Sequence, residues 1–383
     1  MSFSKVRYVD IAPLFGLNPG VKGDDIPTFE MSYARLPNAL FLQILRDIRV
    51  FGKQYGPMDD HENEETRSRY LSAVGSPGNF RNPTVIEKSL LTLRQYFNQT
   101  VSLFDGLVVN TPEAILDGRI TTKGRIEYHF KTYGGVTVVF IEVKLALGSK
   151  TERLDYVAQV IAECDGMVQA SLDLDINSHF TACAWSNYQL GYDLPLMAVL
   201  CDGKCFTFYK FVDKCSADGS PQFFAGVFPD GEMELRIDDV SRRKDIDIPT
   251  FYRNLRKTCD AFYYAFLNGY RSGLEAYWKL SVARSKAESK KRDSTPAWHN
   301  AIVQAGKALD EAKNAWKLYA EGNIEESNDS GEKAAKFLGE RYVARCPSLV
   351  VANSNVVSYF SIEAAPWQGK VILPDPPEGV ENM

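Results

Sequence analysis

Long hydrophobic runs are missing from this chain of 383 residues. No apolar stretch reaches the roughly 20 residues that a membrane-spanning helix needs, and the N-terminus lacks the pattern of a signal peptide. We therefore expect an intracellular protein, in the nucleus or the cytoplasm, that does not bind a membrane. An apolar share of 45% without low-complexity tracts is typical of a globular protein with one large domain or two to three smaller ones.

Cysteine pairs and the best-marked catalytic motifs are also missing. The seven cysteines are an odd number without C-x-x-C spacing, which argues against a disulfide framework or a zinc ribbon. Cys201 and Cys205 flank a predicted turn, but the sequence offers them no further metal-binding partners, so we expect buried thiols. The sequence contains no G-x-x-x-x-G-K-[ST], no G-x-S-x-G and no H-E-x-x-H. It therefore gives no indication of a phosphate-binding loop, a serine-hydrolase elbow or a zinc protease.

An excess of basic residues is absent as well. The net charge is −5 and the isoelectric point is about 5.6, which counts against a protein coated in basic surface for nucleic acid. A local basic groove remains compatible with this balance, because carboxylates at a metal site themselves lower the net charge.

Residues 124–144 predict a β-hairpin, and the rest of the chain is organised around it. Two runs rich in β-forming residues flank Gly134-Gly135, a dipeptide that suits a tight primed turn. If these two glycines form the turn, Tyr133 pairs with Val136, and this first pair sets the register of the whole hairpin.

In this register, Glu127 falls directly opposite Glu142. Side chains alternate along a strand, so Lys144 shares their face. Two opposed carboxylates repel each other, a cost that is easier to understand if a cation sits between them. The opposite face is a plausible core face, with Ile126, Tyr128, Phe130, Val139, Ile141 and Val143.

Glu142-Val143-Lys144 ends the second strand of the predicted hairpin, and the first strand carries an acid. This arrangement resembles the active-site hairpin of the PD-(D/E)XK nuclease superfamily. The segments Gly-Arg-Ile-Glu-Tyr and Phe-Ile-Glu-Val-Lys are similar to nuclease-like domains of fungal Crinkler-type proteins. The resemblance covers residues 80–215 and implies an α/β fold with an αβββαβ restriction-endonuclease-like core and a mixed sheet. One E-x-K triplet is expected by chance in a chain of this length, and Glu311-Ala312-Lys313, in a helical pattern, is such a case.

The resemblance implies a metal-dependent nuclease that cuts DNA, or RNA. Glu127, Glu142 and the backbone carbonyl of Val143 would hold Mg²⁺ or Mn²⁺, hard cations that prefer oxygen ligands. Lys144 would orient the attacking water or stabilise the charge of the transition state. Gln159, on the following helix, would support the site.

The second acid has an alternative. The superfamily's usual residue is Asp, often after Pro, and Asp117 is of this type, although Asp117-Gly118 is also typical of a turn. Glu127 has the better geometry. Glu87, near the start of a predicted helix over 84–97, occupies the place of a further metal ligand, although an acid there also complements the helix dipole.

Hydrophobic patterning predicts the elements around the hairpin. Helices are expected over 36–52 and 151–165, a strand over 101–109, and a hairpin over 196–211 that turns at Asp202-Gly203, with further strands near 227 and 235. Asp155, Gln159 and Glu163 lie four residues apart on the second helix, and this polar stripe faces either the site or solvent.

Basic residues offer candidate contacts to nucleic acid. Arg125 is expected opposite Lys144 on the hairpin, and His129 opposite Phe140. From residue 250 onward long helices are expected, with a break at Gly322 and Asn323. Their early part carries basic residues between aromatics, among them Arg256 and Lys257, which either hold phosphates or form a solvated face.

Four segments follow from these patterns: a loop-rich arm and helix over 1–75, the nuclease core over 76–245, a helical region over 246–345 and an irregular tail over 346–383. The helical region could also form a homodimer. The function predicted is a nuclease acting on nucleic acid, with DNA expected before RNA. The alternative is a catalytically degenerate nuclease fold that binds nucleic acid or protein.

Overall fold

The computed structural model describes the parts of the chain that form two sheets and the helices named below. These are residues 5–20, 26–55, 100–104, 107–110, 114–116, 124–126, 128–132, 135–148, 150–164, 187, 191–192, 194–212, 221–237, 248–287 and 295–339. All belong to one unit, Met1–Ala344, and the second unit, Arg345–Met383, lies outside the described residues.

An eight-stranded mixed sheet forms the centre of this unit. Its order is β1-β9-β8-β7-β6-β5-β2, with β10 paired to β8. The pairs β6–β7 and β1–β9 are parallel and the others are antiparallel. The strands are β1 (Thr28–Glu30), β2 (Val109–Asn110), β5 (Tyr128–Lys131), β6 (Thr137–Val143), β7 (Leu196–Cys201), β8 (Cys205–Val212), β9 (Gln222–Val227) and β10 (Glu234–Arg236).

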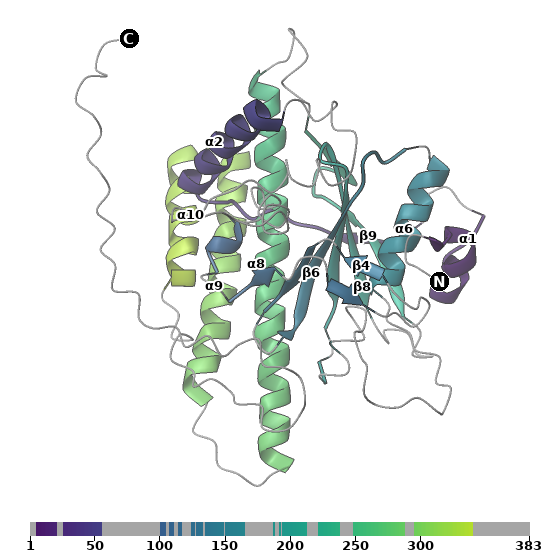
Figure 1. The fold of residues 1–383 in the computed structure, drawn as a ribbon. Helices are drawn as coiled ribbons and strands as arrows, with labels where there is room; N and C mark the ends of the chain where they lie inside the picture. Colours follow the sequence, from purple (N-terminus) through teal and green to yellow (C-terminus); the bar gives the residue numbers. More distant parts are fainter. Residues whose placement is uncertain are drawn as a thin grey trace, which may run out of the picture. The chain divides into compact units, whose positions relative to one another are not determined.

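Helices cover both faces of the sheet (Figure 1). One face carries α1 (Tyr8–Ile11), η2 (Ala12–Phe15) and α6 (Lys150–Cys164). The other carries α2 (Asn38–Tyr55), α8 (Ile248–Ala287), α9 (Thr295–Ala320) and α10 (Ile324–Gly339). A mixed α/β fold with a helical C-terminal region is thus confirmed. Every residue of β6 and β7 is buried, which explains their continuous apolar runs.

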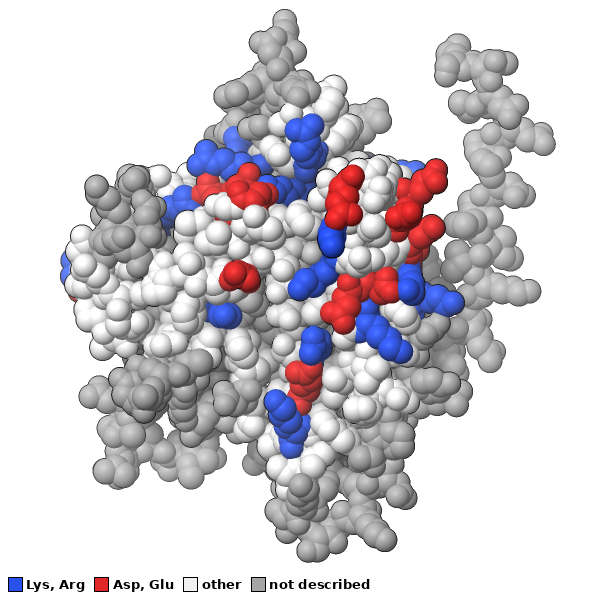
Figure 2. Space-filling model, turned by 180° about the vertical axis from the view of Figure 1, so that it is seen from behind, with Lys and Arg blue, Asp and Glu red and all other residues white. Residues whose placement is uncertain are grey.

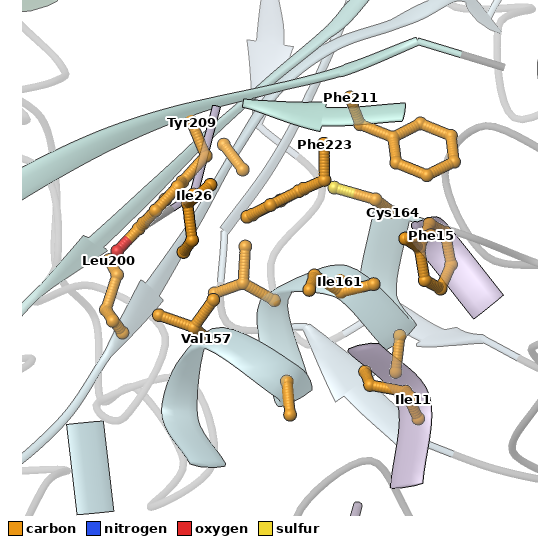
Figure 3. Packing of buried hydrophobic residues seen from close by; sticks show 14 of the residues in the cluster. Ile11, Phe15, Ile26, Val157, Ile161, Cys164, Leu200, Tyr209, Phe211 and Phe223 are labelled. Atoms are coloured by element: carbon orange, nitrogen blue, oxygen red, sulfur yellow. The ribbon is translucent and has the colours of Figure 1, made fainter. Parts of the chain in front are cut away.

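The hydrophobic core between α6 and the sheet also contains residues of the N-terminal segment. Val157, Ile161 and Cys164 of α6 point toward Phe211 and Phe223 of the sheet (Figure 3). Residues of α1 and η2 close the other side of the same cluster, among them Ile11 and Phe15. This packing holds α6 at a fixed position against β6, so its polar residues meet the strand at a defined place.

Two glycines let α8 approach the sheet closely. Gly269 and Gly273 face Val138 of β6, while Phe266, one turn earlier, packs edge-on against Phe130 with ring centroids 4.7 Å apart. A Cβ atom at Gly273 would lie well inside the contact distance of Thr132 and 3.1 Å from Val138 Cγ1. The helix can therefore keep this position only with glycine there.

We expect Gly273→Ala to lower the free energy of unfolding by about 1–3 kcal/mol, because overpacking outweighs the gain in helix propensity. Gly306→Ala in α9 is the matched control, since a Cβ there meets no atom within 4 Å. It should raise stability by about 0.5–1 kcal/mol. Urea unfolding of both variants measures the contrast, and equal effects of the same sign would contradict the close packing.

The predicted hairpin is present, but its turn differs from the prediction. Tyr128, His129 and Phe130 pair with Ile141, Phe140 and Val139, in the register expected from the sequence. The chain turns between Thr132 and Val136, with the N–H of Thr132 donating to the carbonyl of Val136. A bulge between Phe130 and Lys131 restores the register. Gly135 has φ +77, so one glycine serves as the left-handed residue of a longer turn with a bulge.

The strand predicted over residues 101–109 is wrong for most of its length. Residues 100–102 are helical, and only Val109–Asn110 form a strand, β2. Phe104 is fully buried, and its ring packs edge-on against Tyr270 of α8 at 5.2 Å. A helical turn buries this apolar residue just as a strand would, so the apolar pattern alone misled. The predicted helix over 84–97 lies outside the described residues.

Candidate active site

The end of β6 places two charged residues on the α6 side of the sheet. Glu142 is the penultimate residue of β6, and Lys144 follows the strand directly. The N–H of Lys144 donates to the carbonyl of Cys201 at 2.8 Å, which extends the parallel ladder with β7 beyond the last strand residue. The backbone therefore stays extended there, and both side chains point to the same face.

Four side chains meet at this point. Lys144 Nζ lies 2.5 Å from Oε1 of Glu142, and Gln159 Nε2 donates to the same oxygen at 2.6 Å. The Gln159 nitrogen also donates to Oε1 of Glu163 at 2.9 Å. Their exposed fractions are 2% for Glu142, 7% for Lys144 and for Gln159, and 0% for Glu163. The sheet and α6 thus enclose a charged cluster.

The polar stripe of α6 faces protein. Gln159 and Glu163 reach the cluster, and Asp155 accepts a hydrogen bond from the N–H of Tyr8 at 3.0 Å. The solvent-facing alternative is therefore excluded for Gln159 and Glu163, which are buried, while Asp155 is half-buried. The sequence placed Glu163 in the polar stripe but gave it no role of its own in the site.

Asp202 closes the neighbouring end of β7 and is 9% exposed. Its carboxylate accepts hydrogen bonds from the N–H groups of Leu147, Lys204 and Cys205. Asp202 therefore ties the loop after Lys144 to the β7–β8 turn. Its predicted place in that turn favours such hydrogen bonds to nearby N–H groups.

Several predicted site residues lie outside the description. Glu127, Asp117 and Glu87 are outside the described residues. Arg125 lies in β4 (Gly124–Ile126), which pairs with β3 (Ala114–Leu116) in a separate two-stranded sheet, but its side chain is outside the description. The choice of second acid among them stays a prediction. In the described part of the chain, no three His, Cys, Asp or Glu side chains group closely enough to hold a metal ion.

His129 is placed in the interior of the sheet. It is fully buried, and its Nε2 shares a hydrogen bond with Thr137 Oγ1 at 2.6 Å. Burial, with a smaller contribution from the Lys131 charge, holds the pKa of His129 well below its ordinary value. The imidazole is therefore neutral near pH 7. Its environment suits a structural role in the hairpin better than the predicted contact with a phosphate.

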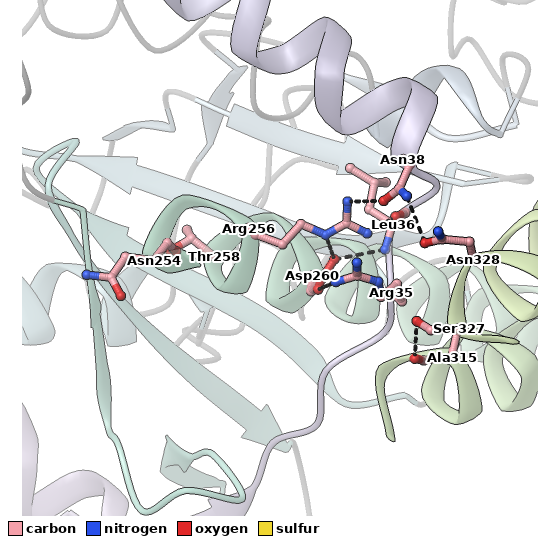
Figure 4. Close-up of polar contacts among 10 residues, drawn as sticks. All are labelled: Arg35, Leu36, Asn38, Asn254, Arg256, Thr258, Asp260, Ala315, Ser327 and Asn328. Atoms are coloured by element: carbon pink, nitrogen blue, oxygen red, sulfur yellow. Dashed lines mark hydrogen bonds and ion pairs between the residues drawn. The ribbon is translucent and has the colours of Figure 1, made fainter. Parts of the chain in front are cut away.

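Arg256 and Lys257 are engaged by the protein itself. Arg256 is 5% exposed, and its guanidinium donates to Asp260, to Asn38 and to the carbonyl of Leu36 (Figure 4). Lys257 forms ion pairs with Asp230 and Glu232 at 2.5 and 2.6 Å. Asp260 lies one turn along α8 from Arg256, whereas Asn38, Leu36, Asp230 and Glu232 belong to other segments. The sequence did not indicate the contacts to these other segments because they are distant in the chain.

Figure 2 shows basic and acidic side chains lying side by side over one face of the molecule. That mixture agrees with the low net charge.

Comparison with known proteins assigns no family to this chain. No family model matches the sequence, and no curated protein matches it either. Within the described residues, no helix is both long and apolar enough to cross a membrane. The geometry of the cluster around Glu142 therefore carries the functional argument.

Proposed function

We propose that the protein is a metal-dependent phosphodiesterase that cleaves nucleic acid, with DNA expected before RNA. One observation carries this proposal: Lys144 and Gln159 converge on a single oxygen of Glu142 at the end of the central strand. The sequence resemblance implies this same trio of carboxylate, ammonium and amide. These residues come from a strand and from the next helix, and their meeting at one point supports the proposal.

The connection of the elements supports the proposal. β5 and β6 form an antiparallel hairpin, α6 follows, and β7 returns parallel to β6. β2 precedes this unit and pairs antiparallel with β5. This is the order of strands and helix that an αβββαβ core requires from its first strand onward, so the restriction-endonuclease-like core belongs to the proposal.

The residues at the site fit a hard divalent cation. Glu142 and Glu163 offer carboxylate oxygens and Val143 a backbone carbonyl, which are the donors that Mg²⁺ and Mn²⁺ prefer. Glu142 and Glu163 are both buried at this point, and buried carboxylates are groups that a bound cation would neutralise. Glu142 and Val143 would hold the cation, with Glu127 as the expected second acid. The bound ion would lower the pKa of a water molecule and offset charge on the phosphate.

The protein's own groups have separable tasks in this scheme. Lys144 carries a fixed positive charge at the end of β6, where it would donate a hydrogen bond to a phosphate oxygen as charge develops on it. Gln159 keeps the Glu142 carboxylate in one orientation through its hydrogen bond. The sheet and α6 exclude bulk water from these contacts, which strengthens them.

Burial favours a second candidate function. Glu142 and Lys144 are 2% and 7% exposed and already form an ion pair. A nuclease fold that has lost activity could keep such a pair for stability and serve as a module that binds nucleic acid or protein. The two functions differ in whether a bound strand is cut.

A cleavage assay distinguishes them. Plasmid DNA, single-stranded DNA and RNA are incubated with the protein in Mg²⁺, Mn²⁺ or EDTA, and retention of each strand on the protein is measured in parallel. Cleavage that EDTA abolishes supports the phosphodiesterase. Binding without cleavage supports the module. The absence of both cleavage and binding for every strand would overturn the phosphodiesterase and the nucleic-acid-binding module, and would leave a module that binds protein.

A further inference from the structure

The amide of Gln159 has only one reasonable orientation. Its nitrogen contacts two carboxylates, Glu142 at 2.6 Å and Glu163 at 2.9 Å. An amide oxygen in that place would be repelled by both, so the NH₂ group must face them. The amide oxygen then points away from the two carboxylates. Gln159 as a whole is 7% exposed.

Burying the Glu163 carboxylate at its position costs free energy. Its side chain is completely buried, and it lies in the last turn of α6, where the helix dipole disfavours an anion. It also lies close to a second carboxylate, since it shares a donor with Glu142. No basic residue in this last turn offsets the dipole. Glu163 accepts a hydrogen bond from the Gln159 amide, so its burial fixes an acceptor beside that amide.

We propose that Glu163 is a positioning residue for the hydrolytic site: it holds the Gln159 nitrogen against Glu142 and so turns the Gln159 oxygen toward the water that attacks the phosphodiester. This inference rests on the proposed phosphodiesterase activity. The oxygen accepts a hydrogen bond from that water and orients its lone pair, while no bond to Gln159 or Glu163 is made or broken. With glutamine at 163, Gln159 keeps only Glu142 as an anionic acceptor, so its amide is held less firmly and its oxygen is aligned with the water less often.

The test is steady-state cleavage of a fluorescent single-stranded DNA in Mn²⁺ by wild type, Glu163→Gln and Gln159→Ala. We expect Glu163→Gln to lower kcat about 10-fold to 100-fold, as expected for an outer partner of a site, with KM and Mn²⁺ affinity within about twofold of wild type. Glu152→Gln, an exposed acid in the first turn of the same helix, is the matched control and should cleave like wild type.

A double-mutant cycle separates positioning from general damage. If Glu163 acts through Gln159, the variant with both substitutions loses no more activity than Gln159→Ala alone. Fully additive losses would overturn the proposal, and so would wild-type kcat in Glu163→Gln while Lys144→Ala is inactive. If wild type itself does not cleave, the phosphodiesterase assignment fails and this inference fails with it, a result that is distinct from the first two.

Circular dichroism and the urea midpoint of Glu163→Gln accompany the kinetics. A folded variant with a lower kcat and unchanged KM supports positioning. A kcat loss that follows a loss of folded protein would assign Glu163 a purely structural role and overturn the proposal.

Discussion

Replacing Lys144 with alanine is expected to lower cleavage of nucleic acid by about 100-fold to 1,000-fold. The Nζ of Lys144 lies 2.5 Å from Glu142. In the function proposed above, this ammonium would offset the charge that develops on the scissile phosphate. Glu142 remains in place to hold the cation, so the Mn²⁺ affinity should stay close to that of wild type. Cleavage rates and calorimetric titration with Mn²⁺, made on the same preparations, measure the two effects.

A second Glu-x-Lys triplet in the same chain offers the matched control. Lys313 follows Glu311 by two residues in α9, is exposed and lies outside the cluster. Lys313→Ala should cleave at the wild-type rate. Lys144→Met, which keeps the length of the buried side chain, tests whether loss of charge suffices. Retained cleavage in Lys144→Ala, or Mn²⁺ affinity lost together with activity, would contradict the division of roles between Glu142 and Lys144.

Asp260→Ala is expected to have the largest effect on stability, a loss of about 3–5 kcal/mol in the free energy of unfolding. Asp260 is 1% exposed and contacts Arg256 at 3.1 Å and Arg35 at 3.8 Å. It also accepts hydrogen bonds from the N–H of Leu36 and thereby ties the segment after β1 to α8 (Figure 4).

Burial raises the pKa of Asp260, so its charge is itself costly. The expected loss comes instead from two buried guanidinium groups that the alanine variant leaves without their acid. Asp310→Ala, an exposed acid in α9, is the control and should change stability by no more than about 0.5 kcal/mol. Urea unfolding followed by circular dichroism measures both variants. An Asp260→Ala midpoint equal to that of the control would show that the network is dispensable.

The sequence predicted the elements whose signals are local. Gly203 and Gly322 have φ values of +86 and +87, and both stand at breaks that their residue type indicated. The apolar spacing over 151–165 predicted α6, Lys150–Cys164, to within a residue at each end. The strand predicted around Phe104 was wrong because a buried aromatic residue fits a helical turn as well as a strand. The ring that Phe104 packs against, Tyr270 of α8, lies more than 150 residues later in the chain.

The candidate site was predictable where residue type and spacing act together. Glu142 and Lys144 share a strand face, and Gln159 was expected from its place in the resemblance, and the structure brings these three together. Arg256 shows the opposite case. Its partner Asp260 lies four residues along the same helix, but an i,i+4 pair also occurs on exposed helix faces, and the contact that accompanies its burial, Asn38, is more than 200 residues away. Glu163 was visible in the polar stripe, but its burial depends on how α6 packs against the sheet.

Calorimetric titration of Mn²⁺ into wild type and Glu142→Gln tests the central claim most directly. The glutamine keeps the size of the side chain and can still accept a hydrogen bond, but it removes the charge that a divalent cation needs. We predict saturable Mn²⁺ binding to wild type that EDTA reverses, and a large loss of affinity in Glu142→Gln. Equal binding to both proteins, or no saturable binding to wild type, would contradict a metal-dependent centre at the end of β6.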